Sequence, residues 1–207
     1  MVKAVWSRML DRRGCLRWDG RMADLVYYSQ CSLDGLIADE GGDFSWAFPP
    51  EDVHRAANDV AARTGVHLLG RRTYEVMRYW DEAREGVPEV EAEFQRAWAP
   101  STKVVYSRSI DWVGPNARIE REFDPAEARA IADAADSEVG IGGADLGGQA
   151  LRAGIVDVLT LVLFPVIIGR GKRVIPQDLR LDLQLTEQRD FSGDIVRLTY
   201  RIPRQAG

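Results

Sequence analysis

The sequence contains few of the residues that build metal or disulfide sites. Its 207 residues include two cysteines, Cys15 and Cys31, and two histidines. Neither cysteine stands in a C-x-x-C or Cys/His cluster of the kind that binds zinc, and two cysteines are too few for a disulfide framework. We therefore expect no metal centre, and a reducing compartment, the cytoplasm.

Long apolar runs and excess positive charge are also missing. No segment approaches the roughly 20 apolar residues that a bilayer-spanning helix requires. The net charge is −5, whereas a surface that binds nucleic acid needs basic residues that displace counterions from phosphates. We expect neither a membrane segment nor a nucleic-acid partner.

What is present suits a globular domain. Hydrophobic residues make up 45% of the chain, enough for a substantial core. Residues 1–21 differ from the rest because they are rich in arginine and lack a clear period, and they end just before Met22. We expect a non-core extension there, arising from an upstream start codon, a flexible arm or a basic leader, and a single domain over residues 22–207.

Strand-like and helix-like segments alternate from Met22 onward. Strands are expected at residues 25–31, 66–70, 102–107, 138–142 and 156–168, and helices at 51–64, 71–80, 88–98, 125–135 and 146–153. In the second helix, the spacing predicts that Thr73, Val76, Met77 and Trp80 share one helical face. Residues 181–185 and 195–202 flank the turn signal SGD and predict an antiparallel hairpin. This order indicates an α/β fold with a mostly parallel central sheet and an antiparallel C-terminal hairpin.

The glycine-rich stretch VGIGGADLGGQALRAGIVDVL begins at Val139, where a strand should meet a helix. It lacks the third glycine of the dinucleotide-binding G-x-G-x-x-G pattern, and GRGK at residues 169–172 is too short for a Walker A loop. Two interpretations remain open. Gly142 and Gly143 either form a tight turn, or they let an anionic group approach the first amides of the helix.

Two further junctions between a strand and a helix or loop carry anion-binding side chains. Gly70-Arg71-Arg72-Thr73 follows one expected strand, and Ser107-Arg108 ends another. Arginine is well suited to forked phosphate recognition. Ligands of open α/β sheets bind at the carboxyl ends of the strands, so these junctions favour an anion-binding cradle.

The ordered segments SLDGLIA, GRRTYE, KVVYSR, IGGADL, LRAGIVD and FPVIIGRGKRVIP resemble the dihydrofolate reductase-like family. They are most similar to the reductase domain at the C-terminus of the bifunctional deaminase-reductase of bacterial riboflavin biosynthesis. The resemblance covers roughly residues 22–201. It implies a three-layer dihydrofolate reductase-like fold, an eight-stranded sheet, an NADPH cofactor and a homodimer. We expect no deaminase activity from these residues, because they lack the zinc-binding pattern of that half.

The resemblance also implies roles for individual residues. Gly70, Arg71 and Thr73 would contact the cofactor phosphates, Ser107 and Arg108 the 2′-phosphate, and Gly142, Gly143, Ala144, Asp145 and Leu146 the diphosphate, while Ile37 and Ala38 would border the nicotinamide. The Gly142–Gly143 bond would be cis. Asp34 would bind substrate and supply a proton, with a simple Asp-Gly turn as the alternative. Trp46 would stack on the substrate, or only cover the core.

The implied substrate is 5-amino-6-(5-phosphoribosylamino)uracil. Two departures from the family pattern leave alternatives open. Asp145 stands where many dihydrofolate reductases have a basic residue, so NADH competes with NADPH as the cofactor. The expected inner face of the first long helix carries no carboxylate, which makes dihydrofolate a doubtful substrate. Reduction of another pterin or heterocycle, or a catalytically silent nucleotide-binding protein, are the alternatives.

Overall fold

A central sheet organises the protein in the computed structural model, which describes residues 23–82 and 84–203. Its eight strands lie in the order β5-β4-β3-β6-β1-β7-β10-β9. They are β1 (Leu25–Ser32), β3 (Thr64–Gly70), β4 (Thr102–Tyr106), β5 (Ala117–Glu120), β6 (Glu138–Gly142), β7 (Val158–Phe164), β9 (Gln184–Phe191) and β10 (Ile195–Arg201). The first six strands in this order pair in parallel with their neighbours. Strand β10 then pairs antiparallel with β7 and forms an antiparallel hairpin with β9. The predicted sheet is confirmed, whereas the predicted extension at residues 1–21 lies outside the described residues.

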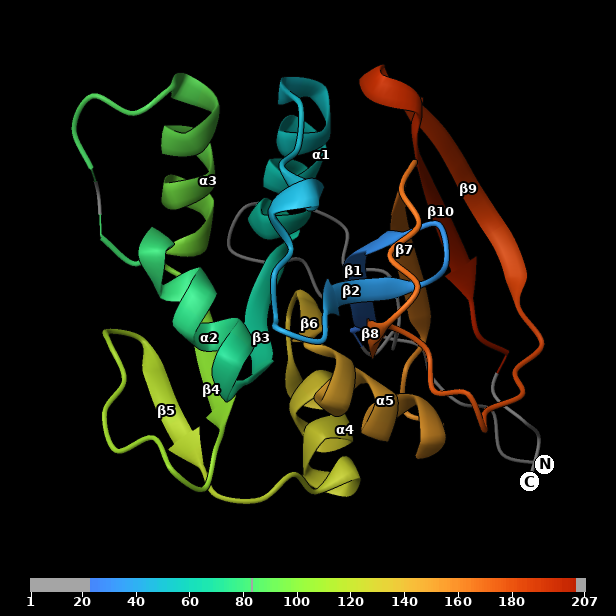
Figure 1. Cartoon of the computed structure of the whole chain (residues 1–207). Coiled ribbons are helices and arrows are strands. Elements are labelled where there is room, and N and C mark those ends of the chain that lie inside the picture. Colours follow the sequence, from blue (N-terminus) through green and yellow to red (C-terminus); the bar gives the residue numbers. More distant parts are fainter. Residues whose placement is uncertain (1–22, 83, 204–207) are drawn as a thin grey trace, which may run out of the picture.

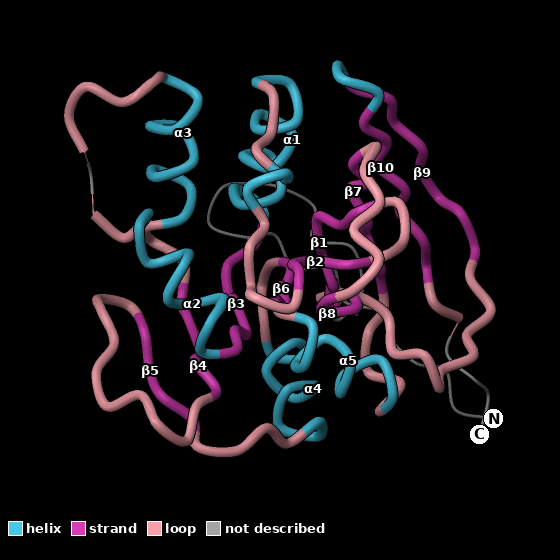
Figure 2. The backbone as a smooth tube through the Cα atoms, in the orientation of Figure 1, coloured by secondary structure: helices cyan, strands magenta, loops and turns pink. Residues whose placement is uncertain are grey.

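Helices cover both faces of this sheet, as Figures 1 and 2 show. They are α1 (Glu51–Arg63), α2 (Arg71–Met77), α3 (Glu89–Trp98), α4 (Pro125–Ala134) and α5 (Ala144–Arg152). Helices α4 and α5 pack on one face, in a core that includes Leu68 and Val104. Helices α1, α2 and α3 pack on the opposite face, in a second core that includes Leu69 of β3 and Val105 of β4. These two residues directly follow Leu68 and Val104 in their strands. Because side chains alternate across a strand, the sheet is the middle of three layers.

Local sequence explains where several helices begin and end. Helix α4 starts after Asp124, whose carboxylate accepts a hydrogen bond from the Ala126 amide, and Pro125 occupies its first position. Helix α5 is followed by Gly154, which adopts a φ of +66°, a conformation that glycine takes at little cost. Among the described residues, none of the helices combines the length and apolar character needed to cross a membrane.

Two predictions from the pattern were wrong in detail. Met77 and Trp80 pack against the second core, but Val76 is 46% exposed. The fully buried side chain of α2 is that of Tyr74, whose hydroxyl accepts a hydrogen bond from the Gly114 amide. Helix α2 is only seven residues long and gives way to a 3-10 turn at Arg78–Trp80, so a regular helical period does not run through it. The first strand of the hairpin also begins at Gln184, not at residue 181.

A separate two-stranded antiparallel sheet was not expected. It joins β2 (Leu36–Asp39) to β8 (Gly171–Arg173). Gly171 permits this contact, because a Cβ atom there would overlap the carbonyl oxygen of Ala38. We call this pair the β2–β8 flap. It lies in front of the main sheet in Figure 1.

The glycine-rich stretch has a packing function within α5. Gly147 lies against the ring of Tyr27, which is fully buried in β1, and a Cβ atom at residue 147 would overlap that ring. A Cβ at the next residue, Gly148, would come 3.2 Å from Pro176. Gly147 therefore sets how closely α5 approaches the sheet.

We expect Gly147→Ala to lower the free energy of unfolding by about 1–3 kcal/mol, the usual cost of overpacking a core. Gly148→Ala is the matched control, since alanine favours a helix and a Cβ there would stay 3.2 Å from its nearest neighbour, Pro176, without overlapping it. Chemical denaturation of both variants measures the difference. Equal stability of the two would contradict the packing role of Gly147.

A buried polar cluster ties α3 to β3 and β4. Lys103 is fully buried, and its ammonium donates hydrogen bonds to the carbonyls of Trp98 and Ala99 at the end of α3. The Trp98 indole donates to Asp81 at 2.7 Å, and Asp81 lies 3.6 Å from the Lys103 ammonium. The His67 ring packs 4.5 Å from that of Trp98. Burial, together with the Lys103 charge, lowers the pKa of His67 to about 3.

This low pKa predicts a pH dependence of stability. The unfolded chain binds a proton at His67 below about pH 6.5, whereas the folded protein does not, so acidification lowers the free energy of unfolding. The slope of the free energy of unfolding against pH, measured between pH 8 and pH 5, should be smaller in His67→Phe by at most about 1.4 kcal/mol per pH unit. Comparing slopes removes any pH-independent packing cost of the substitution. An unchanged slope would show that His67 titrates normally in the fold.

Candidate cofactor site

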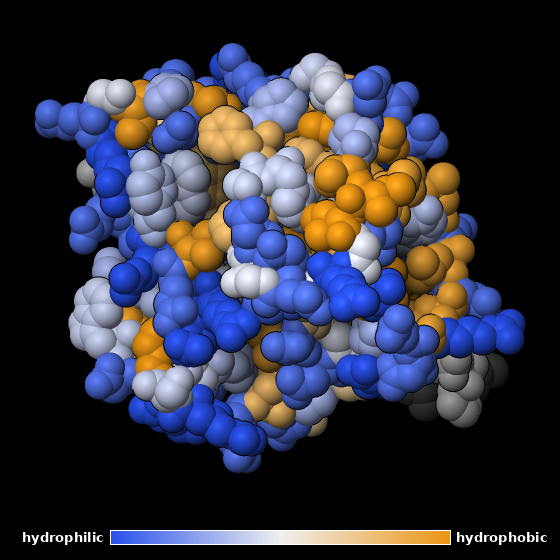
Figure 3. Space-filling view, in the orientation of Figure 1, coloured by the Kyte–Doolittle hydropathy of each residue, from blue (hydrophilic) through white to orange (hydrophobic). Residues whose placement is uncertain are grey.

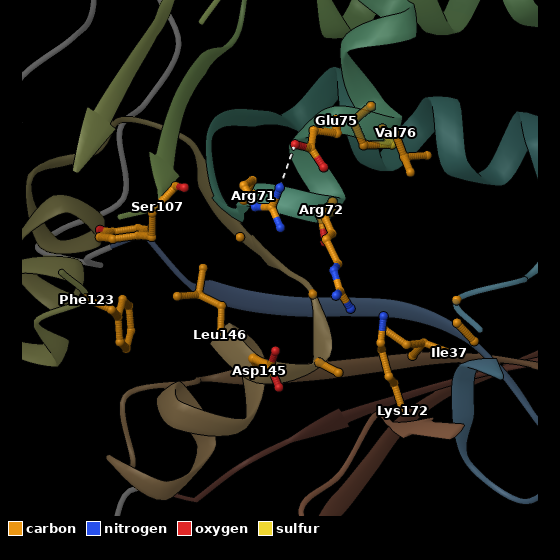
Figure 4. A pocket seen from close by; sticks show the side chains of 18 of the residues that line it. Ile37, Arg71, Arg72, Glu75, Val76, Ser107, Phe123, Asp145, Leu146 and Lys172 are labelled. Carbon is orange, nitrogen blue, oxygen red and sulfur yellow. Dashed lines mark hydrogen bonds and ion pairs between the residues drawn. The ribbon is translucent and has the colours of Figure 1, made fainter. Parts of the chain in front are cut away.

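An open cleft of about 1110 Å³ lies at the carboxyl ends of β3, β4 and β6. Hydrophilic residues gather where α2 faces the β2–β8 flap (Figure 3), and a close view of the cleft is given in Figure 4. Of the residues proposed from sequence, those lining it are Ile37, Ala38, Gly70, Arg71, Thr73, Ser107, Arg108, Gly143, Ala144, Asp145 and Leu146. The parallel strands bring together these segments, which are far apart in the chain.

Gly143 shapes the floor of this cleft. Its φ is +101°, in the region that favours glycine, and a Cβ there would lie 2.7 Å from the Thr73 hydroxyl. The residue caps α5, so the chain turns from β6 into the helix at the cleft surface. Every described peptide bond is trans, including Gly142–Gly143, so the predicted cis bond is wrong. The conformation of Gly143 alone makes the turn.

The end of β4 forms a second, rigid part of the wall. The Ser107 hydroxyl accepts hydrogen bonds from the amides of Ser109 and Ile110 at 3.2 and 3.1 Å. Arg121 donates to the carbonyls of Ser107 and Ile110 at 3.1 and 2.6 Å. Ser107 is therefore buried in a hydrogen-bonded turn, and Arg108 beside it is exposed.

The charges of the cleft nearly balance. Its cations are Arg71, Arg72, Arg108, Arg121 and Lys172, and its carboxylates are Glu40, Glu75, Glu122 and Asp145. Arg71 pairs with Glu75 at 3.2 Å, and Arg108 with Glu122 at 3.6 Å. Exposed pairs of this kind contribute about 0–1 kcal/mol. An anionic ligand could therefore displace the carboxylates at low cost.

Asp34 lies outside the residues that line the cleft. Its carboxylate accepts hydrogen bonds from the Ser32 hydroxyl at 2.6 Å and from the amides of Ile168 and Gly169 at 3.2 and 2.7 Å. The Ser32 and Gly169 donors lower its pKa to about 2, so it is ionised at neutral pH and has no proton to donate. This placement favours a positioning role, in which Asp34 holds the loop before β8, over the catalytic role expected from sequence.

Trp46 and Gly142 also lie away from the cleft surface. The Trp46 ring meets that of Phe164 edge to face, 5.9 Å between centroids, and packs against the core around Val53 and Val162. Gly142 is enclosed by Leu69 and Thr73, which a Cβ would approach to 3.1 and 3.4 Å. The structure thus gives Trp46 the covering role that sequence left as its alternative.

Several lining residues were missed by sequence reasoning. Arg72 was named within the junction Gly70-Arg71-Arg72-Thr73 but was given no contact of its own, and Lys172 was considered only as part of GRGK. Sequence pointed to both segments, but not to a role for either side chain. Tyr106 stands within the quoted segment KVVYSR but was given no role. Arg121 and Phe123 carried no signal, because a strand end and a loop meet there only in the folded chain.

Comparisons with known proteins agree with this geometry. Residues 136–197, which run from before β6 into β10, match the family model described as the RibD C-terminal domain. The resemblance predicted from the motifs is confirmed. Over 171 residues the chain is 25% identical to the uncharacterized protein YyaP of Bacillus subtilis, covering 82% of this chain and 89% of that protein.

Solved structures show the same fold. A putative riboflavin biosynthesis protein from Shewanella sp. PV-4 superposes with a TM-score of 0.68 at 18% identity, covering 87% of this chain and 99% of that one. Dihydrofolate reductase from Enterococcus faecalis, complexed with NADP(H), gives 0.62 at 15% identity, covering 87% and 97%. The fold is therefore dihydrofolate reductase-like, as expected.

A third structure is a bifunctional protein. It is a diaminohydroxyphosphoribosylaminopyrimidine deaminase/5-amino-6-(5-phosphoribosylamino)uracil reductase from Thermotoga maritima, with a TM-score of 0.59 and 17% identity. The match covers 88% of this chain but 57% of that one. The RibD-like fold thus accounts for a part of the larger protein.

The position of Asp34 gives a testable expectation. Asp34→Asn replaces one carboxylate oxygen by an NH2 group, which cannot accept a hydrogen bond. The Ile168 and Gly169 amides bond to different oxygens of Asp34, so we expect faster hydrogen exchange at whichever of these two amides loses its acceptor. Asp43→Asn is the control, because the one hydrogen-bond partner of the Asp43 side chain within residues 23–82 and 84–203 is Ser45, two residues away. Hydrogen exchange followed by mass spectrometry or NMR measures both. Unaltered protection of the loop in Asp34→Asn would refute the positioning role.

Proposed function

We propose that the protein is an NADPH-dependent reductase of a small heterocycle, with 5-amino-6-(5-phosphoribosylamino)uracil as the substrate class. The main support for this proposal is that the ends of β3, β4 and β6 lie at one cleft, and each strand end presents groups suited to bind part of a dinucleotide. The RibD family match and the dihydrofolate reductase-like neighbours support a reductase-like function. Cytoplasmic location and a homodimer belong to the proposal, and β9, an exposed strand at the edge of the sheet, offers a surface for pairing.

The residues present fit such a cofactor. Gly143 exposes backbone at the start of α5, and Gly70 borders open space, since a Cβ there would meet no atom within 4 Å. The Thr73 hydroxyl makes no hydrogen bond to any described residue, so it is available to a phosphate. We assign Arg71, Thr73 and Gly143–Leu146 to the diphosphate, and Ser107 and Arg108 to the 2′-phosphate.

When bound, the nicotinamide supplies the hydride. The protein's contribution is to place the two reacting rings and to exclude water from the space between them. Ile37 and Ala38 in β2 offer an apolar border for the nicotinamide. Because Asp34 is ionised and bonded to the loop, solvent is the proposed proton source.

A direct test is titration with NADPH and NADH, followed by protein fluorescence, and then NADPH oxidation with a panel of pyrimidines and pterins. Binding at submillimolar concentration and oxidation with a pyrimidine are expected. Failure to bind either cofactor would overturn the proposal. Binding without oxidation across the panel would favour a catalytically silent nucleotide-binding protein.

Cofactor choice gives a sharper prediction. Arg108 is 83% exposed at its side chain and weakly paired to Glu122, so it is free to turn toward a 2′-phosphate. We expect Arg108→Ala to weaken NADPH about tenfold or more, the loss of a charge-assisted hydrogen bond, with little change for NADH. Arg118→Ala, in β5 outside the cleft, is the control. Equal weakening of both cofactors would show that Arg108 does not contact the 2′-phosphate.

A further inference from the structure

Two cations of the cleft have no ion-pair partner among the residues that the structure describes. Arg71 and Arg108 form ion pairs, and Arg121 binds two carbonyls. Arg72 and Lys172 form no ion pair with any carboxylate of residues 23–82 and 84–203. Glu40 and Asp145 line the same cleft, but neither lies within ion-pair distance of them. These two side chains therefore differ from the other cations of the cleft.

The two side chains come from opposite sides of the cleft and point toward each other. Arg72 lies in the first turn of α2 and is exposed, whereas Lys172 lies in β8 and is half-buried. In Figure 4 the guanidinium of Arg72 faces the ammonium of Lys172. Like charges in this arrangement repel each other, and an anion between them would replace the repulsion by charge-assisted hydrogen bonds.

The flap determines where this anion would lie. Lys172 pairs with Ala38 in the register of β2 and β8. Glycine at residue 171 allows the two strands to lie this close, because a Cβ atom there would overlap the Ala38 carbonyl oxygen. Lys172 is therefore fixed beside Ile37 and Ala38, the end of the cleft assigned to the nicotinamide, and on the far side of Arg72 from Ser107 (Figure 4).

We propose that Arg72 and Lys172 form a clamp for a phosphate carried by the second substrate. This inference rests on the proposed function, because the ring that receives hydride must lie against the nicotinamide. A phosphate joined to that ring through a pentose would reach the same end of the cleft. The cofactor diphosphate has other ligands, Arg71, Thr73 and the amides after Gly143. Arginine supplies a forked donor and lysine a point charge, a combination suited to a phosphate monoester.

The test compares two probes that differ only in the phosphate, uridine 5′-monophosphate and uridine. Calorimetry at low salt, with the protein saturated with NADP⁺ and again without it, measures their affinities. We expect the wild-type protein to prefer the nucleotide by about tenfold or more. Arg72→Gln and Lys172→Gln should each remove most of this preference, while leaving uridine affinity unchanged and NADPH affinity within about twofold.

Arg173→Gln is the matched control, since Arg173 is the next residue of β8, is exposed and does not line the cleft. It should retain the wild-type preference, and circular dichroism should confirm that all three variants fold. Equal affinities of the wild-type protein for the two probes, or no binding of the nucleotide, would overturn the clamp. A parallel loss of NADPH affinity in Arg72→Gln and Lys172→Gln would also overturn it, by assigning the pair to the cofactor.

Failure of the proposed function would look different. A wild-type protein that does not bind NADPH would refute the reductase proposal. The preference for the nucleotide in the cofactor-free protein would still decide whether the clamp exists. The two proposals are therefore tested by separate measurements.

Discussion

The parallel pairing of β3 with β4 and β6 places the ends of three strands at one edge of the sheet, and every feature of the cleft depends on it. Parallel strands require crossover connections, which here are the helices that cover both faces. Each connection leaves the sheet at the same edge, so Gly70, Ser107 and Gly143 become neighbours although the chain separates them widely. Without this pairing the three junctions would be unrelated turns.

The glycines of the stretch from Val139 serve two different purposes. Gly143 needs its positive φ and borders the cleft, whereas Gly147 lies on the inner side of α5, where only a hydrogen fits against Tyr27. The sequence left two interpretations of Gly142 and Gly143, a tight turn or an anion-binding cradle. These do not exclude each other, because a strand-to-helix turn at this edge of the sheet is part of the cleft wall. The tight packing at Gly147 then fixes the helix whose first residues face any bound anion.

Charge in the cleft is arranged in pairs that a ligand can reorganise. Arg71 and Arg108 each have an exposed carboxylate nearby, so their charges are partly compensated within the protein. Water screens such pairs strongly, and exchanging a carboxylate for a phosphate costs little. Asp145 places a carboxylate at the start of α5, beside the cleft. A carboxylate there is unfavourable for the phosphates of the proposed cofactor, so it bears on the proposed choice between NADPH and NADH.

The sequence by itself determined the order of elements, most of their boundaries and the segments that line the cleft. Local patterns carry that information, because hydrophobic period, glycine turns and helix caps act over a few residues. Only the tertiary structure decided which side chains meet. It buried Tyr74 and placed Trp46 over the core. It also bonded Asp34 to a loop 134 residues away in the chain and set Arg72 opposite Lys172. Such contacts depend on the relative placement of distant segments, which no local pattern encodes.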